Sequence, residues 1–253
     1  MSEDKKDLVA DQPKEMQDWE LAMRAKQAAQ EKMKASLKQG PSFISFRGGQ
    51  LLIDKTPVPN GTLQVIVLTF AAENAFYKGR FDPDSPQNPK CWAVYKDITS
   101  MEPDPTCEEI QHDICEECPK FQWGSDPLGG RGKACKSRYR IAVIPNALTY
   151  EEVLAAEMRM GVLPVTSTKA FEKFMSACQM LFNRPIFGVV TEIKVTPDVK
   201  TQFKVELTPI AAIDPSLIPA IIARSDSADN AIMYGYRGAD EEEAAVAPKK
   251  TLK

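Results

Sequence analysis

The chain has 253 residues, 43% of them apolar, and a formal net charge of −3. Length and composition predict one large domain or two small ones with a packed core, and the acidic balance excludes a globally cationic nucleic-acid binder. No apolar run approaches the roughly 20 residues that span a bilayer, and the N-terminus is too charged for a secretory signal. We therefore expect a cytoplasmic protein without membrane contacts.

Residues 1–40 are predicted to form a polar helical arm. A helical stretch runs from about Glu15 to Lys38, with a thin apolar stripe, and the pair Gly40-Pro41 ends it. A solvated arm is the favoured interpretation, and a partner-binding helix is the alternative. The stripe consists of Trp19, Met23, Gln30, Met33 and Leu37.

A β-rich pattern begins at Phe43. Short β-prone runs follow around Leu51, and a turn over residues 57–61 leads to the run Leu63 to Phe70. Strands separated by Gly, Pro and Asn are typical of an antiparallel barrel or sandwich. A proline-rich loop over residues 83–89 then leads into Cys91, so it marks the entry to a cysteine-rich insertion, residues 91–135.

After the insertion, the pattern predicts a return to the sheet. We expect a strand at Tyr139 to Ile144, a helix at Tyr150 to Met160, an amphipathic helix at Ser167 to Asn183, and a hairpin of residues 186–195 and 202–209. These elements complete a core of residues 41–214. Residues 215–253 follow as a short helix, 215–223, and a tail expected to be disordered, with the acidic run Asp240 to Glu243.

Five of the six cysteines lie between Cys91 and Cys135, which indicates a local metal site in a reducing compartment. Cys115 and Cys118 have the two-residue gap that lets both sulfurs of a tight turn face one zinc ion. Two further ligands must come from Cys91, Cys107, His112 or Cys135. We favour Cys91 and Cys135, with Cys107 in reserve and His112 outside. A closed shell of four thiolates predicts a structural Zn2+; metal-free cysteines are the alternative, and a redox role is disfavoured.

The densest positive run also lies here. Cations neutralise phosphates and aromatic faces stack on unpaired bases, so a basic and aromatic mixture suits a single strand better than a duplex. The equally weighted alternative is aromatic residues in the core with cations as a solvated rim. The first patch holds Arg131, Lys133, Lys136, Arg138 and Arg140 with Phe121, Trp123 and Tyr139; the second holds Phe76, Tyr77, Lys78, Arg80 and Phe81.

The cysteine segment and its flanks resemble a family of tailed-phage single-stranded DNA-binding replication or recombination proteins. The resemblance covers roughly residues 43–210 and rests on Cys115-Glu-Glu-Cys-Pro119, Gln122-Trp-Gly-Ser125 and Gly132-Lys-Ala-Cys-Lys136. It implies an α+β, OB-like barrel with a zinc insertion and peripheral helices. Cys91, Cys115, Cys118 and Cys135 match the recurring cysteines, whereas Cys107 lies outside that pattern. If phage-encoded, the chain acts in the host cytoplasm.

The favoured function is non-catalytic binding of single-stranded DNA. The acidic tail is expected to occupy a basic groove, to recruit replication or recombination proteins, or only to add solubility. In phage single-strand binders of similar plan the acidic region lacks the lysines that follow here, Lys249, Lys250 and Lys253. An enzyme would need clustered carboxylates or an open zinc position, and the sequence offers neither. The other alternative is a structural zinc module that contacts proteins through residues 167–183.

Overall fold

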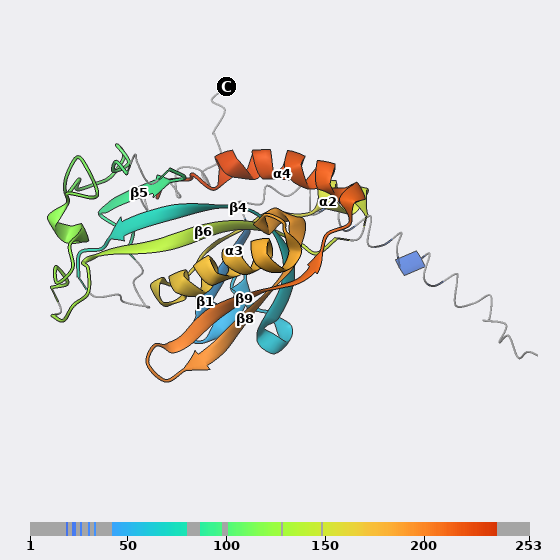
Figure 1. The fold of residues 1–253 in the computed structure, drawn as a ribbon, viewed down its shortest axis with the longest axis horizontal. Coiled ribbons are helices and arrows are strands. Elements are labelled where there is room, and N and C mark those ends of the chain that lie inside the picture. The colour runs from blue at the N-terminus through green and yellow to red at the C-terminus, as the bar shows by residue number, and fades with distance from the viewer. Residues whose placement is uncertain are drawn as a thin grey trace, which may run out of the picture. The chain divides into compact units, whose positions relative to one another are not determined.

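We describe the fold from a computed structural model (Figure 1). It describes residues 42–79, 87–97, 101–127, 129–147 and 149–236. In the arm it describes only isolated positions, all helical: Trp19, Ala22, Met23, Lys26, Gln30 and Met33. The chain divides into two units, Met1–Gly40 and Pro41–Lys253. Arg80, Phe81 and the acidic run lie outside the described residues.

The second unit is built on one curled, open, nine-stranded sheet with the order β3-β2-β1-β7-β6-β4-β8-β9, and β5 pairs with β4 outside this path. All described pairs are antiparallel except β1 with β7. The strands are β1 Ser42–Arg47, β2 Gln50–Ile53, β3 Thr56–Pro57, β4 Thr62–Phe76, β5 Cys91–Tyr95, β6 Cys135–Pro145, β7 Arg159–Val162, β8 Val189–Asp198 and β9 Gln202–Ala212.

Three α-helices and several short 3-10 turns accompany the sheet in the second unit's described residues. Helix α2 starts with a capping box, because the Thr149 hydroxyl accepts from the Glu152 N–H and the Glu152 side chain accepts in return. Helix α3 ends at Asn183, whose left-handed backbone (φ 50°) closes it. The helices are α2 Tyr150–Ala155, α3 Thr168–Phe182 and α4 Ile218–Ala231; the 3-10 turns are Pro59–Gly61, Pro119–Phe121, Val165–Ser167, Ile186–Gly188 and Pro215–Leu217.

Strands β4 and β6 are apolar on both faces because each face has its own core. Val65 and Val67 point into the curl, where Phe171 and Phe174 of α3 pack on them. Ile66 and Leu68 point to the other face, which α4 covers (Figure 1). Burial on both faces explains why the sequence here is a continuous apolar run rather than an alternating one.

Strand β4 has two features that position the functional region. Its register with β6 shifts between Val67 and Thr69, so Leu68 forms a β-bulge. Its other edge pairs first with β8, at residues 62–66, and then with β5, at residues 72–76. The far end of β4 therefore holds β5 and β6 on either side, and the insertion leaves and re-enters the sheet there.

The α+β, strand-rich class is confirmed, as are the helix at residues 167–183 and the hairpin. Two predictions are wrong in extent. The helix expected to reach Met160 stops at Ala155, because residues 159–162 form β7 between β6 and β1. The last helix continues to Ala231, because Ile221 and Ala228 are buried in the outer core. No helix in the described part of the chain is long and apolar enough to cross a membrane.

Candidate metal centre and nucleic-acid interface

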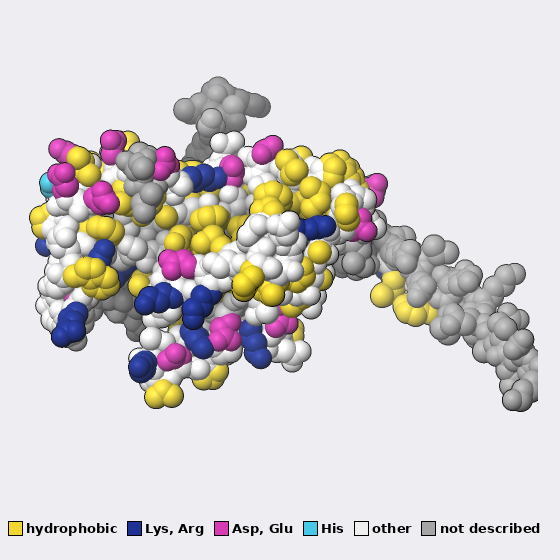
Figure 2. Space-filling view, viewed as in Figure 1, with side chains coloured by type: hydrophobic (Ala, Val, Ile, Leu, Met, Phe, Trp, Pro, Cys, Tyr) yellow, Lys and Arg dark blue, Asp and Glu magenta, His cyan; other side chains and the backbone are white. Residues whose placement is uncertain are grey.

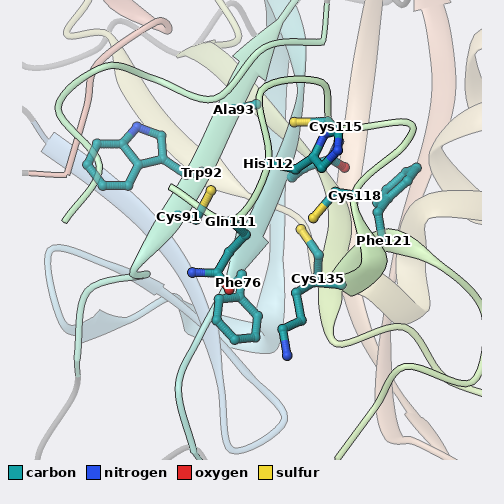
Figure 3. Close-up of a pocket in the computed structure, with 12 residues that line it drawn as sticks. Phe76, Cys91, Trp92, Ala93, Gln111, His112, Cys115, Cys118, Phe121 and Cys135 are labelled. Carbon is teal, nitrogen blue, oxygen red and sulfur yellow. The ribbon is translucent and has the colours of Figure 1, made fainter. Parts of the chain in front are cut away.

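Four cysteines line one small cavity at the far end of β4. Cys91 opens β5 and Cys135 opens β6, and each lies in register with Phe76 of β4, on its two sides. Cys115 and Cys118 come from the loop between these strands. Figure 3 shows the sulfur atoms of Cys115, Cys118 and Cys135 pointing toward the side on which Cys91 lies. The chain thus brings distant thiols to one place.

The loop turns tightly around the Cys115–Cys118 pair. The Cys115 N–H donates to the Met101 carbonyl (2.9 Å), and the Cys118 N–H donates to the Cys115 carbonyl (3.2 Å). The Phe121 N–H in turn donates to the Cys118 carbonyl (2.9 Å). This is a two-residue turn of the kind that presents both sulfurs to one ion in zinc knuckles.

The four thiols are electrostatically crowded. Burial, and then the neighbouring Cys115, Cys118 and Cys91, raise the pKa of Cys135 to about 12. Burial, followed by Cys91 and Cys118, raises the pKa of Cys115 to about 11. Thiolates so placed repel one another, and a cation among them would reverse that penalty.

Four cysteine sulfurs are a donor set that suits zinc, but they are not arranged at the distances of bound ligands. The cavity holds about 10 Å³, which is room for one water-sized particle and excludes an organic ligand. Among the described residues, no group of three or more His, Cys, Asp or Glu side chains is arranged so that it could hold a metal ion. Zn–S bonds of about 2.3 Å would therefore require the sulfurs to move inward.

The two reserve candidates differ in their surroundings. His112 lines the same cavity, but the Ile114 N–H lies 3.1 Å from its Nδ1. The Ile114 carbonyl oxygen lies 3.0 Å from the same Nδ1. If Nδ1 accepts from the N–H, the ring proton sits on Nε2; if Nδ1 donates to the carbonyl, Nε2 keeps a lone pair that could bind a metal. Cys107 lies behind Cys91 and packs against the cluster of Phe76, Cys91 and Cys135. It is not among the residues that line the cavity.

The cation–aromatic loop, residues 119–134, connects Cys118 to Cys135. Lys133 Nζ lies 3.6 Å from the ring centroid of Phe121 and 5.1 Å from that of Trp123. Trp123 is 77% exposed, a higher fraction than for any other aromatic residue whose side chain the structure describes. The loop is braced internally, since the Gly124 N–H donates to the Gly132 carbonyl (2.9 Å). An indole face is therefore held in solvent beside an ammonium group.

Arg138 and Arg140 do not belong to this surface, which corrects the sequence prediction. Both point to the outer face of β6; Arg138 lies opposite Glu73 of β4, and Arg140 lies opposite Ala71, two residues from Glu73 on the same face. Arg140 Nη2 and Arg138 Nε each lie 2.6 Å from a Glu73 oxygen, and the Tyr236 hydroxyl donates to the same carboxylate (2.6 Å). Glu73 and Arg140 are both 0% exposed, so Arg140 cannot reach a phosphate in solution.

This buried network, which we call the Glu73 cluster, also fastens the segment that follows α4. Arg140 Nη1 donates to the carbonyls of Ile232 and Tyr234, and its guanidinium lies 4.1 Å from the Tyr234 ring centroid. Burial opposes ionisation of Glu73, but the two guanidinium groups outweigh it and hold the pKa of Glu73 below its usual value. The arginines are thus structural counter-charges.

The other predicted contact residues are largely engaged. Lys136 Nζ pairs with Asp126 (2.7 Å), and Lys78 Nζ pairs with Glu109 (3.3 Å). Tyr77 accepts from Arg138 (2.7 Å), and Tyr139 packs against Phe70 and Phe171 in the inner core. Arg131 is exposed. Of the two predicted patches, Trp123, Arg131 and Lys133 remain as the group best placed to meet a ligand.

Sequence reasoning missed Glu73, the residue that organises the arginines. A signal was present, because Glu73 is an acid inside the apolar run 62–76 and such a residue is buried only when it is paired. It also missed that residues 102–117 contain Glu102, Asp104, Glu108, Glu109, Asp113, Glu116 and Glu117 and no Lys or Arg. The insertion therefore has an acidic half, 102–117, and the cation–aromatic loop. Figure 2 shows acidic and basic side chains gathered at separate places on this end of the molecule.

Comparison with known proteins identifies no relative: no family model, no curated protein and no solved structure matches the chain.

Proposed function

We propose that this protein is a non-catalytic binder of single-stranded DNA that uses the cation–aromatic loop. The observation that supports this most directly is Trp123, whose indole is 77% exposed and has Lys133 at 5.1 Å. Aromatic rings beside a cation, as Phe121 and Trp123 lie beside Lys133, form the kind of surface on which unpaired bases stack. An indole face stacks on any unpaired base, and the ammonium group neutralises the adjacent phosphate.

The same chemistry favours a single strand over a duplex. Bases in a duplex are stacked on each other, so Trp123 would find no free base face without unpairing the strands. Stacking contributes about 1 to 3 kcal/mol per base, and each neutralised phosphate adds a salt-dependent term. With Arg131 and Lys133 as cations of the cation–aromatic loop that have no ion pair among the described residues, we expect modest affinity and tolerance of sequence.

The proposal includes a structural Zn2+ held by Cys91, Cys115, Cys118 and Cys135. Its support is the convergence of four buried cysteines, two of which have raised thiol pKa values, on a cavity with room for one water-sized particle. The ion would supply cross-linking, because four thiolates leave no open position for water. Since Cys118 and Cys135 begin and end the cation–aromatic loop, their spacing would set the position of Trp123.

The resemblance to tailed-phage replication or recombination proteins belongs to the same proposal, as does the OB-like barrel. What supports the barrel is a curled, mainly antiparallel sheet with α3 across its inner face. Recruitment of replication or recombination proteins by the acidic tail remains a proposal that rests on the sequence alone.

A zinc module acting through protein contacts is the second candidate. The observation in its favour is on α3, the helix through which the alternative function would contact partners, where Met180 is 78% exposed and Leu181 is 65% exposed. These two apolar side chains lie on the sheet domain, far in sequence from the cation–aromatic loop. Substitutions on α3 therefore test the protein-contact function, and substitutions in the loop test DNA binding.

Fluorescence anisotropy with single-stranded and duplex oligonucleotides of equal length tests the proposal, at several salt concentrations. We expect tighter binding of the single strand and a negative slope of log K against log salt. Trp123→Ala should weaken this binding, whereas Met180→Ser should leave it unchanged. Equal affinity for both oligonucleotides at low salt would favour the protein-contact module.

A further inference from the structure

Cys107 is the fifth cysteine of the insertion, and it packs against the cluster that contains Cys91 and Cys135. Its sulfur contacts the backbone of Trp92, the residue that follows Cys91 on β5. By contrast, Cys91, Cys115, Cys118 and Cys135 all line the central cavity. Cys107 is therefore next to the Cys91 segment but outside the cavity that the four proposed ligands line.

The Cys107 sulfur also closes the open edge of β5. The Trp92 N–H donates to it (3.1 Å), and its S–H lies 3.3 Å from the Trp92 carbonyl oxygen. These are the polar groups of the residue directly after Cys91, on the edge away from β4. The sulfur accepts one hydrogen bond and donates another, so it satisfies the two backbone groups that a neighbouring strand would otherwise pair.

A turn holds Cys107 in this place. Its N–H donates to the Asp104 carbonyl (3.0 Å), and the Asp104 N–H donates to the Trp92 carbonyl (2.8 Å). The Asp104 side chain accepts from the Thr106 N–H (2.9 Å), and the Glu109 N–H donates to the Lys90 carbonyl (2.9 Å). The segment from Asp104 to Glu109 is therefore tied to both sides of Cys91.

We propose that Cys107 is a positioning residue for the metal centre: its thiol bridges the N–H and the carbonyl of Trp92 and so fixes the start of β5, and with it Cys91, without binding the ion. This rests on the proposed zinc site. Cys91 needs such support because it is the ligand on the short strand β5, whereas Cys115 and Cys118 support each other and Cys135 lies on long β6. Without the bridge to Trp92, the open edge of β5 directly beside Cys91 would lose both of these hydrogen bonds.

Two metals test the assignment in the full chain with Cys107→Ala, Cys107→Ser and, as the control, Cys91→Ala. Cobalt(II) reports the number of bound thiolates through its sulfur charge-transfer absorption. We expect Cys107→Ala to keep the absorption of wild type, and Cys91→Ala to lose a quarter of it. Zinc transfer to a chromophoric chelator should be about 10-fold faster for Cys107→Ala. Cys107→Ser, which still donates and accepts, should restore much of the slow release.

Each other outcome overturns the assignment in its own way. Loss of one thiolate's absorption in Cys107→Ala would make Cys107 a ligand. Release at the wild-type rate from Cys107→Ala would show that it positions nothing. If wild type takes up neither metal, the zinc site itself fails, and oligonucleotide binding by that metal-free wild type then decides whether the proposed function survives.

Discussion

Two parts of one basic run have opposite fates. Arg131 and Lys133 lie in the cation–aromatic loop, where Arg131 is exposed and Lys133 lies against two aromatic rings. Arg138 and Arg140 lie only a few residues further along, on β6, and both are paired with Glu73. Cations that look equivalent in the sequence therefore divide into a surface group and a core group.

The division follows from strand periodicity and from one distant acid. Residues two apart on a strand share a face, so Arg138 and Arg140 point together at the neighbouring strand β4. A carboxylate directly opposite turns two costly buried charges into a satisfied network. The lesson is that a basic run is evidence of an anion site only where no acid is in register with it.

Metal removal should affect the two regions most unequally. A strong zinc chelator should abolish binding of the single-stranded oligonucleotide, because the ends of the cation–aromatic loop lose their cross-link. The cooperative unfolding of the sheet, followed by circular dichroism, should remain. Elemental analysis of Cys118→Ser should show loss of about one zinc per chain. If the metal-free protein bound the oligonucleotide as tightly as the untreated protein, the cation–aromatic loop would not depend on the metal.

Glu73→Gln should damage the core region alone. It leaves two guanidinium groups without a counter-charge, so we expect a loss of about 3–5 kcal/mol in unfolding free energy, measured by urea titration. Glu206→Gln, which breaks an exposed pair with Lys204, should leave the unfolding free energy almost unchanged. Below the melting transition, the Glu73→Gln variant should still bind the oligonucleotide.

The cost of Glu73→Gln should also depend on pH. Because the folded-state pKa of Glu73 lies below its ordinary 4.5, its contribution to stability is complete above that pH and is lost as the pH falls through the folded value. The difference in unfolding free energy between wild type and the variant should therefore narrow in acid. A difference that grows in acid would contradict the assigned ion pairs.

Trp123→Ala should affect the loop alone. Loss of one stacked base costs about 1–3 kcal/mol, so the dissociation constant should rise about 5- to 150-fold with no change in unfolding free energy. Trp123→Phe keeps a ring and should recover part of this loss. Equal weakening by both variants would indicate that the indole N–H, rather than its face, makes the contact.

The smallest expected effect is on the salt slope. Arg131→Ala with Lys133→Ala should reduce the slope of log K against log salt by about 1.4, at about 0.7 per phosphate contact on a single strand. Lys194→Ala with Lys200→Ala removes two exposed cations from the β8–β9 hairpin and serves as the matched control. A reduction of equal size in the control would mean that net charge alone attracts the strand.

Local patterns predicted the elements with strong periodicity, and longer contacts decided the rest. Helix α3 follows from buried Phe171, Phe174 and Cys178, spaced three and four residues apart. Strand β7 could not be predicted from its local pattern, because this short segment forms a strand only through pairing with β1 and β6. Likewise, the grouping of the cysteines could be predicted from their spacing. The burial of Arg140 could not, because it depends on Glu73, 67 residues away.

The β-bulge at Leu68 gives β4 one residue more than the stretch of β6 that it pairs with. If the chain lost a single residue at this point, the pairs on both sides could become continuous, with Glu73 still opposite the arginines. Strand β6 has no extra residue in its pairing with β4. A residue lost from β6 would therefore turn Arg138 and Arg140 toward the opposite face of the sheet. Length variation in this fold should therefore be tolerated on one of these two strands and not on the other.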